Sequence, residues 1–332
     1  MQGGRQRRRM EEQSQSQGRE IPFQNLFLIS GLVNGWNKFW MYAGTLLFLV
    51  IAYILFQFLA FFPLLQRLFT RGYNRSEIES DPNLLFDSAA LGLDRNLLLV
   101  LELGMFAFAF AGFFIGLRFM HQKTLQSVLT GYDKFRTSRF VFAFITWSAL
   151  LVVFLGIQYV LNPGEFTFSA EPAGLLISAL IMLVLMPIQT GLEEVVFRGY
   201  LIQGLAQVLR NGVVPLIITS LVFGLAHMSN PEVRRFGWEI MLPYYVLFAL
   251  FMGAVTLLDE GLELAIGIHF ANNMVSSILI SSPNSVIKTY SLFSVKTEDP
   301  KSEMLGWLLM AGISFSLFAW KYKWKNFKLI IK

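Results

Sequence analysis

Long apolar stretches recur along most of the chain and are separated by short polar segments. Eight of them approach the ~20 residues that a helix needs to cross a bilayer, although the fifth and the eighth are short. They lie at about 40–65, 97–118, 140–161, 173–200, 213–228, 239–258, 262–281 and 304–320. This pattern predicts an all-α polytopic membrane protein with about eight transmembrane helices.

The first 38 residues differ from the rest because they lack such a stretch. Residues 1–20 are polar and rich in Arg, which predicts a disordered cytosolic tail and, without a nearby apolar run, no signal peptide. Residues 21–38 mix apolar and polar positions, a pattern that fits an interfacial helix and a plain linker equally well. The predicted organisation is a tail and interfacial segment at 1–38 followed by a transmembrane helical domain at 39–332.

The composition agrees with a membrane location. Charged residues make up 15% of the chain, against about 25% in soluble globular proteins, and 33 residues are Phe. These values exclude a disordered chain and argue against an ordinary cytosolic enzyme. The absence of Cys excludes disulfides, thiolate metal sites, iron–sulfur clusters and a Cys nucleophile. Any histidine chemistry must use His121, His227 or His269.

The distribution of Lys and Arg predicts that both termini lie in the cytosol. With the N-terminus inside, the inside segments hold 17 of these residues and the outside loops hold 9, when Arg198, which falls within a predicted helix, is left out. The basic tails and the pI near 9.4 fit attraction to the anionic cytoplasmic leaflet of the bilayer, so they need no nucleic-acid partner.

One small-residue pair lies within the second apolar stretch. Gly112 and Gly116 form a GxxxG pattern, which lets two membrane helices approach closely, although chance matches are frequent. The pattern predicts a close helix contact at this place.

Polar residues interrupt the apolar stretches in three clusters. Ionisable groups inside a membrane are costly, so by default they face the interior of the helix bundle and indicate a site. The clusters are Glu193, Glu194 and Arg198 at the end of the fourth stretch, Phe223 and His227 in the fifth, and His269, Asn272 and Asn273 in the seventh. Helical spacing predicts an ion pair between Glu194 and Arg198, and it places His269 beside Asn273.

Each cluster also has a simpler interpretation. The Glu pair and Arg198 mark the cytosolic end of the fourth helix equally well, and a lone intramembrane His more often packs than catalyses. Asn272 and Asn273 fit ordinary hydrogen bonding between helices. His121 follows the second stretch among basic residues, and no role is assigned to it.

Together, the order and spacing of the three clusters resemble those of the CPBP family, also called the Abi family. Its members include CAAX prenyl proteases and bacteriocin-processing or immunity proteins. The family pattern is EExxxR, then FxxxH, then HxxxN. Glu193, Glu194 and Arg198 match the first element, Phe223 and His227 the second, and His269 and Asn273 the third. The resemblance covers about residues 170–285.

The resemblance implies an intramembrane endopeptidase with a catalytic cavity among the helices. By position, Glu193 and His227 would activate the attacking water, and His269 with Asn273 would stabilise the oxyanion. Glu194 and Arg198 would hold the site together. Apart from the resemblance, helical spacing places Phe223 one turn before His227, where its ring can support the imidazole. The implied substrate is a membrane-associated or prenylated protein or peptide.

The involvement of a metal stays open at this stage. Glu193, His227 and His269 make a plausible ligand set for zinc or another divalent metal. A Glu–His pair can also activate water without a metal.

Rival functions account for fewer of these residues. A b-type haem bound by His227 and His269 leaves the Glu pair unexplained, and a proton-coupled transporter lacks its expected inverted repeat. A non-catalytic membrane scaffold or a bacteriocin-immunity factor stays open as an alternative. The chain lacks the HExxH, GxSxG and GxGD motifs of other intramembrane proteases.

The depths of the three clusters do not agree in this scheme. A helix starting near Pro172 places Glu193 about 31 Å along its axis, close to the cytosolic surface. On the same arithmetic His269 lies about 10 Å and His227 about 20 Å from that side. Convergence requires a tilt, a bend at Pro187 or Pro215, or different helix starts.

Overall fold

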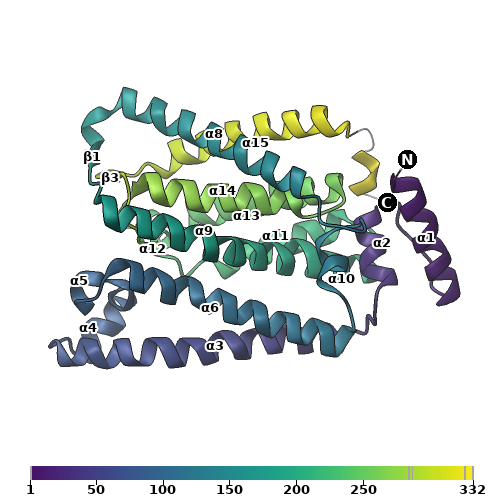
Figure 1. The fold of residues 1–332 in the computed structure, drawn as a ribbon, viewed down its shortest axis with the longest axis horizontal. Coiled ribbons are helices and arrows are strands. Elements are labelled where there is room, and N and C mark those ends of the chain that lie inside the picture. Colours follow the sequence, from purple (N-terminus) through teal and green to yellow (C-terminus); the bar gives the residue numbers. More distant parts are fainter. Residues whose placement is uncertain (1, 283–284, 286, 325–326, 331–332) are drawn as a thin grey trace.

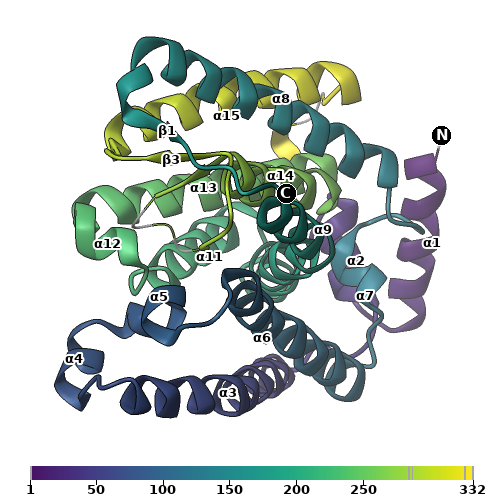
Figure 2. The same ribbon diagram turned by 60° about the vertical axis from the view of Figure 1, so that its left-hand side comes forward.

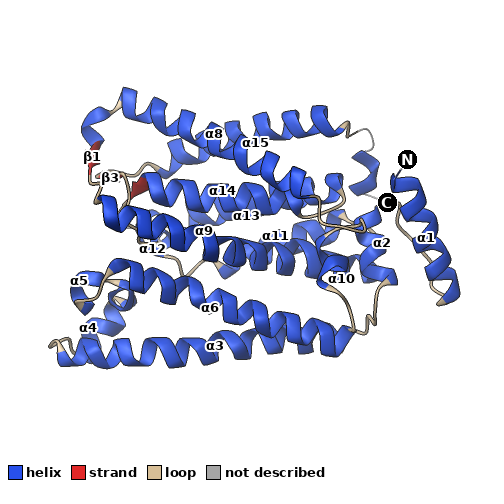
Figure 3. Cartoon of the chain, in the orientation of Figure 1, coloured by secondary structure: helices blue, strands red, loops and turns tan. Residues whose placement is uncertain are grey.

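The chain folds into one bundle of long helices in the computed structural model, which describes all residues except 1, 283–284, 286, 325–326 and 331–332 (Figure 1). The long helices are α3 (Phe39–Thr70), α6 (Arg95–Gly116), α8 (Thr137–Leu161), α9 (Pro172–Glu194), α13 (Trp238–Asp259) and α15 (Pro300–Tyr322). The shorter α-helices are α1 (Gln2–Ser16), α2 (Leu26–Val33), α4 (Arg75–Ser80), α5 (Ser88–Leu91), α7 (Leu125–Leu129), α10 (Ile202–Leu209), α11 (Val213–Ala226), α12 (Pro231–Phe236) and α14 (Glu263–Leu279). The predicted all-α class is confirmed (Figure 3).

Helical turns of other kinds extend or link these helices. The π-helical segments η2 (Leu117–His121) and η4 (Val195–Leu201) continue α6 and α9, and the 3-10 turns are η1 (Pro82–Phe86), η3 (Pro163–Glu165) and η5 (Phe327–Ile330). The strands β1 (Phe166–Phe168), β2 (Ile280–Ser281) and β3 (Phe293–Val295) form a small sheet in the order β1-β3-β2. β3 pairs antiparallel with β1 and parallel with β2.

Six helical segments among the described residues are long and apolar enough to cross a membrane. They correspond to six of the eight predicted stretches, so a multi-pass integral membrane protein is confirmed but the count of eight is not. The stretches at 213–228 and 262–281 form α11, with 14 residues, and α14, with 17 residues. The fourth stretch is longer than predicted, because α9, η4 and α10 run on without a break from Pro172 to Leu209.

Helix α14 occupies the centre of the bundle. It packs against α8, α9 and α13, and every residue from Glu263 to Ala271 is buried. Helix α11 packs on α13, α15 packs on α8 and α13, and α6 joins the peripheral α3 to α9 (Figure 2). The helix at the centre of the bundle therefore carries the cluster around His269.

The predicted close helix contact lies between α6 and α3. A Cβ atom on Gly112 would come within 2.5 Å of the Phe48 carbonyl oxygen, and one on Gly116 within 2.8 Å of the Thr45 Cα atom. Only glycine allows the two backbones to approach this closely.

The N-terminal segment corrects one prediction. Residues Gln2–Ser16, predicted as disordered, form α1, which packs on α2 and buries Met10. Within residues 21–38, helix α2 forms, and seven of its eight residues are buried against the rest of the chain, so this part is not a plain linker. Asn25 begins α2 and accepts hydrogen bonds from the Phe27 and Leu28 N–H groups. A single buried apolar residue in a polar segment is too weak a pattern to predict docking.

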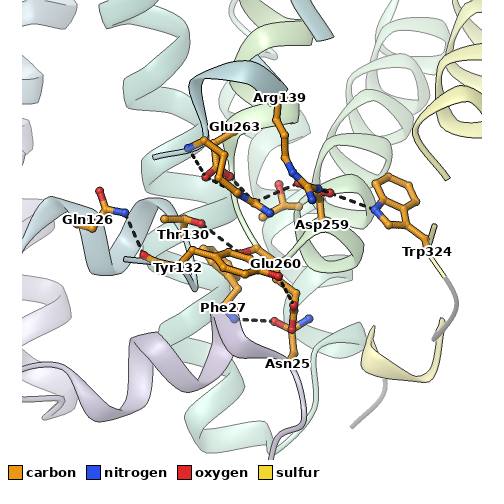
Figure 4. A network of polar contacts seen from close by, with 12 residues as sticks. Asn25, Phe27, Gln126, Thr130, Tyr132, Arg139, Asp259, Glu260, Glu263 and Trp324 are labelled. Atoms are coloured by element: carbon orange, nitrogen blue, oxygen red, sulfur yellow. Dashed lines mark hydrogen bonds and ion pairs between the residues drawn. The ribbon is translucent and has the colours of Figure 1, made fainter. Parts of the chain in front are cut away.

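Polar contacts hold the turn between α13 and α14 (Figure 4). Glu260 has a positive φ of 56°, and its carboxylate accepts hydrogen bonds from the Leu26 N–H and the Tyr132 hydroxyl. Burial raises the pKa of the Glu260 carboxyl group. The turn is thereby tied to α2 and to the loop before α8.

Ion pairs fix the start of α14 against α8. Arg136 contacts the carboxylate of Glu263 at 2.6 Å and that of Asp259 at 3.1 Å. Arg139 also pairs with Asp259, which accepts a hydrogen bond from the Trp324 indole N–H (Figure 4). These ion pairs therefore fix the N-terminus of α14, the helix that carries His269.

Candidate active site

Glu193 and Glu194 lie in the interior of a helical run. Sixteen residues of helix follow Glu193 before the run ends at Leu209. The interpretation that these residues mark the end of the fourth helix is therefore wrong. Arg198 is 1% exposed and lies in η4, so its side chain is enclosed by the protein. A π-helical turn directly after two glutamates is a feature that is frequent at functional sites.

A buried ion pair stands at the centre of the site. The Arg198 Nη1 atom lies 3.1 Å from the Glu194 Oε1 atom, which confirms the predicted pair, and both side chains are almost completely buried. The same carboxylate oxygen lies 2.8 Å from Nδ1 of His269. Because a carboxylate can only accept, His269 donates from Nδ1. One glutamate thus orients both an arginine and a histidine.

His269 also faces the second glutamate. Its Nε2 atom lies 3.7 Å from the Glu193 Oε2 atom, so the imidazole is placed between the two carboxylates. Both ring nitrogens therefore face carboxylates, which argues against His269 as an axial haem ligand. The two glutamates contact different ring atoms because adjacent helical residues point about 100° apart.

A chain of amides leads from α14 to Glu193. Asn273 donates from Nδ2 to the Gln189 side-chain oxygen at 3.3 Å, and Gln189 donates to the Glu193 carboxylate. Asn272 donates to the Oδ1 atom of Asn273 at 3.2 Å, which fixes the orientation of that amide. Since an Asn side chain has two N–H donors, one remains for a further acceptor.

His227 comes from a different side of the bundle. It is the residue directly after α11, and its Nδ1 atom lies 2.8 Å from the Phe223 carbonyl oxygen. Nδ1 therefore carries the hydrogen, and Nε2 of the neutral ring is an acceptor without a hydrogen-bond partner among the described residues. The half-buried ring is free to accept a proton or to bind a water.

Aromatic rings connect His227 to the buried charges. The Phe223 ring lies 4.2 Å from the His227 ring, as predicted. The Arg198 guanidinium group lies 4.1 Å from the centre of the Phe223 ring. Phe248 contacts Phe223 on one side and His269 on the other. No hydrogen bond or ion pair within the described residues joins His227 to Glu193 or His269.

The three side chains considered as metal ligands are not gathered at one point. Among the described residues, no three His, Asp or Glu side chains form a group able to hold one metal ion. Glu193 and His269 lie together, whereas His227 contacts Phe223 and Tyr245. The set of Glu193, His227 and His269 therefore does not fit zinc in this arrangement.

Two polar atoms at the centre of the site have no partner. The Glu194 Oε2 and Arg198 Nη2 atoms are buried without a hydrogen bond to any described residue. Such atoms are rare in folded proteins and call for a physical explanation, such as a bound water or ligand. Their place beside His269 leaves one hydrogen-bond acceptor and one donor unused at the centre of the site.

Sequence reasoning missed Gln189, Phe248 and Tyr245. Gln189 lies four residues before Glu193, so a polar residue at helical spacing was a usable signal. No comparable signal marks the two aromatic residues, because Phe and Tyr are common in every helix of the chain. His121 is buried, and its ring nitrogens contact the Trp36 carbonyl oxygen and the Tyr200 hydroxyl group.

Comparison with known proteins places these residues in a family context. Residues 172–275 match the sequence model of a family described as type II CAAX prenyl endopeptidase Rce1-like. The chain is also similar to the uncharacterised protein YyaK of Bacillus subtilis (strain 168), with 28% identity over 295 residues, which span 88% of this chain and 95% of that protein. No solved structure matches the chain. Residues 172–275, which hold Glu193, Arg198, His227 and His269, are therefore similar to the Rce1-like family of type II CAAX prenyl endopeptidases.

Proposed function

We propose that the chain is an intramembrane endopeptidase in which Glu193 and His227 activate a water molecule for attack on a peptide bond. The observation that carries this proposal is His269, held between Glu193 and the buried Glu194–Arg198 pair inside the family segment. A simple structural ion pair needs neither the second carboxylate nor the histidine. The combination supplies a base and hydrogen-bond donors at one place, which peptide hydrolysis requires.

In this mechanism Glu193 is the general base. Its carboxylate is fixed by Gln189 and faces His269, and it takes the proton of the attacking water as the new C–O bond forms. For His227 to bind the same water, its acceptor atom Nε2 has to move toward Glu193, because no hydrogen bond or ion pair joins the two side chains among the described residues. The collected proton then passes to the leaving amine as the C–N bond breaks, so the carboxylate is regenerated.

His269 and Asn273 serve the developing oxyanion. With His269 protonated, two carboxylates, one guanidinium and one imidazolium sum to zero charge, which suits a buried cluster. The Nε2–H group of His269 and the free N–H of Asn273 are then available to the carbonyl oxygen. Glu194 and Arg198 hold these donors in place without touching the substrate.

The proposed substrate is a peptide segment that enters the bundle from the membrane or its surface, in the simplest case a prenylated C-terminus. The family description supports this substrate class. Cleavage of a farnesylated CAAX peptide and of the same peptide without the lipid separates a prenyl protease from a broader endopeptidase. Membrane-proteome termini from cells with wild-type and Glu193→Gln protein identify natural substrates.

The decisive variant is Glu193→Gln, because an amide cannot take the proton of water. We expect Glu193→Gln to abolish cleavage while peptide binding changes little. Glu12→Gln makes the same chemical change at an exposed position on α1 and should cleave at the wild-type rate. Cleavage by Glu193→Gln would refute the mechanism, and an inactive wild-type protein would favour a scaffold or immunity role.

Metal removal tests whether side chains activate the water without a bound metal. Because the described residues assemble no group of three metal-binding side chains, we expect turnover to survive treatment with a strong zinc chelator. Loss of activity that added zinc restores would instead support a metal held by Glu193, His227 and His269 after a rearrangement.

A further inference from the structure

A cavity distant from the candidate active site opens beside the first turn of α3. Its volume is about 460 Å³, within the range of about 300–1,000 Å³ that small-molecule sites occupy. It is lined by Arg19, Leu32, Trp36, Asn37, Lys38 and Gln207. These residues come from three separate parts of the chain: the segment after α1, the region from α2 to the start of α3, and α10.

The cavity carries positive charge that nothing in the described chain neutralises. Arg19 donates to the carbonyl oxygens of Leu32 and Gly35, which fixes the guanidinium group in the wall. Neither Arg19 nor Lys38 forms an ion pair with a carboxylate of a described residue. Two cations in one cavity without an acidic partner indicate an anionic ligand.

The surroundings of the cavity have the character of a membrane interface. Trp36, Phe39 and Trp40 are 54%, 85% and 57% exposed, and aromatic side chains of this kind gather at the level of lipid headgroups. Helix α3 starts at this rim and lies at the edge of the bundle (Figure 1). Only 6% of the apolar stretch of α3 is buried against the rest of the chain. The outer face of this helix is therefore available to acyl chains from the rim onward.

We propose that this cavity binds the phosphate headgroup of one anionic phospholipid, whose acyl chains lie along the exposed face of α3. Arg19 and Lys38 pair with the phosphate. Asn37 and Gln207, whose amide nitrogens donate to the carbonyl oxygens of Leu32 and Gly31, form the polar wall beside it. The lipid ties α3 to the segment after α1 and to α10.

The cavity lies too far from Glu193 to take part in peptide hydrolysis. Gln207 lies fourteen residues beyond Glu193 on one helical run, which corresponds to about 21 Å. A substrate carboxylate three residues beyond the cleaved bond reaches at most about 11 Å. The anion is therefore not the C-terminus of a CAAX substrate, and the proposal does not depend on the proposed function.

Native mass spectrometry of the purified full chain tests the proposal. The probes are phosphatidylglycerol, phosphatidylcholine and glycerol 3-phosphate, each titrated against the delipidated protein in micelles. We expect one phosphatidylglycerol to bind in preference to phosphatidylcholine. Neutralising both cations in Arg19→Gln/Lys38→Gln should weaken this binding by about tenfold or more. The single variant Lys38→Gln, at an exposed position whose side chain makes no hydrogen bond or ion pair with a described residue, should weaken it in the same direction.

The matched control is Arg5→Gln/Arg8→Gln, which removes two exposed charges from α1 at the same end of the molecule. Wild-type binding in this control would support the cavity. Equal loss in both double variants would refute it in favour of general surface attraction. Equal binding of both phospholipids would refute the anion site, and equally tight binding of glycerol 3-phosphate would indicate a soluble phosphate ligand and overturn the lipid assignment.

Discussion

The polar side chains of Glu194, Arg198 and His269 are tolerable in an apolar bundle only because they bond to and orient one another. Their side chains are between 0% and 5% exposed. Taking such groups out of water is unfavourable unless each finds a partner of good geometry. Glu194 supplies that partner to both basic groups through a single oxygen, so each contact depends on the other two residues.

The first prediction concerns Arg198. Arg198→Ala removes the partner of a buried carboxylate, and breaking such a pair costs about 3–5 kcal/mol. We therefore expect a large loss of folded protein in size-exclusion profiles together with a loss of activity. Arg198→Lys should restore only part of both, because an ammonium group lacks the planar guanidinium geometry that stacks on Phe223.

A second ion pair at the same spacing provides the control. Arg75 and Glu79 are also four residues apart, but their side chains are 86% and 63% exposed. Arg75→Ala should leave folded yield and activity near the wild-type values, because exposed pairs contribute little. Full yield and full activity of Arg198→Ala would mean that the buried pair is not required.

The second prediction concerns Asn273 as an oxyanion donor. Asn273→Ala should lower kcat by about 10²–10³ with little change in KM, as loss of one such donor does elsewhere. Steady-state kinetics with the cleaved peptide measure both constants. Ser276→Ala, one turn away on α14 and bonded only to backbone carbonyls, serves as the control. An unchanged kcat in Asn273→Ala would assign the amide to packing.

At the scale of elements, the sequence predicted which segments form helices better than it predicted where those helices end. Six apolar stretches became long helices because length and composition alone decide that outcome in a bilayer. The continuation of α9 through η4 into α10 was missed. Charged residues in an apolar stretch can mark the end of a membrane helix or a buried site, and the sequence does not distinguish the two. The Glu194–Arg198 pair followed from local spacing, whereas the contact of His269 with Glu194 joins residues 75 positions apart and depends on how α14 packs on α9.

The third prediction tests the crossing of α3 and α6. Gly112→Ala adds one methyl group that would meet the Phe48 backbone and the Ala52 side chain at 2.5–2.6 Å. Overpacking of this kind costs about 1–3 kcal/mol, so the thermal unfolding temperature should fall. In contrast, Gly156→Ala in α8 meets nothing within 4 Å and should gain about 0.5–1 kcal/mol from helix propensity. Equal effects of the two variants would contradict a close contact.

At the scale of the whole molecule, the N-terminal and C-terminal segments lie at the same end of the helix bundle. Helix α1 and the turn η5 lie at one end of the bundle, whereas α4 and the strands lie at the other (Figure 1). The excess of Lys and Arg in segments at the first end predicts that it faces the cytosol. Under this orientation the lipid cavity beside α3 belongs to the cytoplasmic leaflet, whose anionic lipids match its charge.

The fourth prediction tests this orientation with a chain that contains no natural Cys. Single cysteines introduced as Ser16→Cys on α1 and Ser76→Cys on α4 occupy exposed positions at opposite ends of the bundle. In intact cells a membrane-impermeant maleimide should label Ser76→Cys, because that end lies outside. Ser16→Cys should react only after the membrane is permeabilised. A fluorescent reporter fused after Lys328 should report the cytosol, since the C-terminal turn shares the end that carries α1. Labelling of Ser16→Cys in intact cells would invert the topology, and it would move the proposed lipid to the opposite leaflet without changing the geometry of the candidate active site.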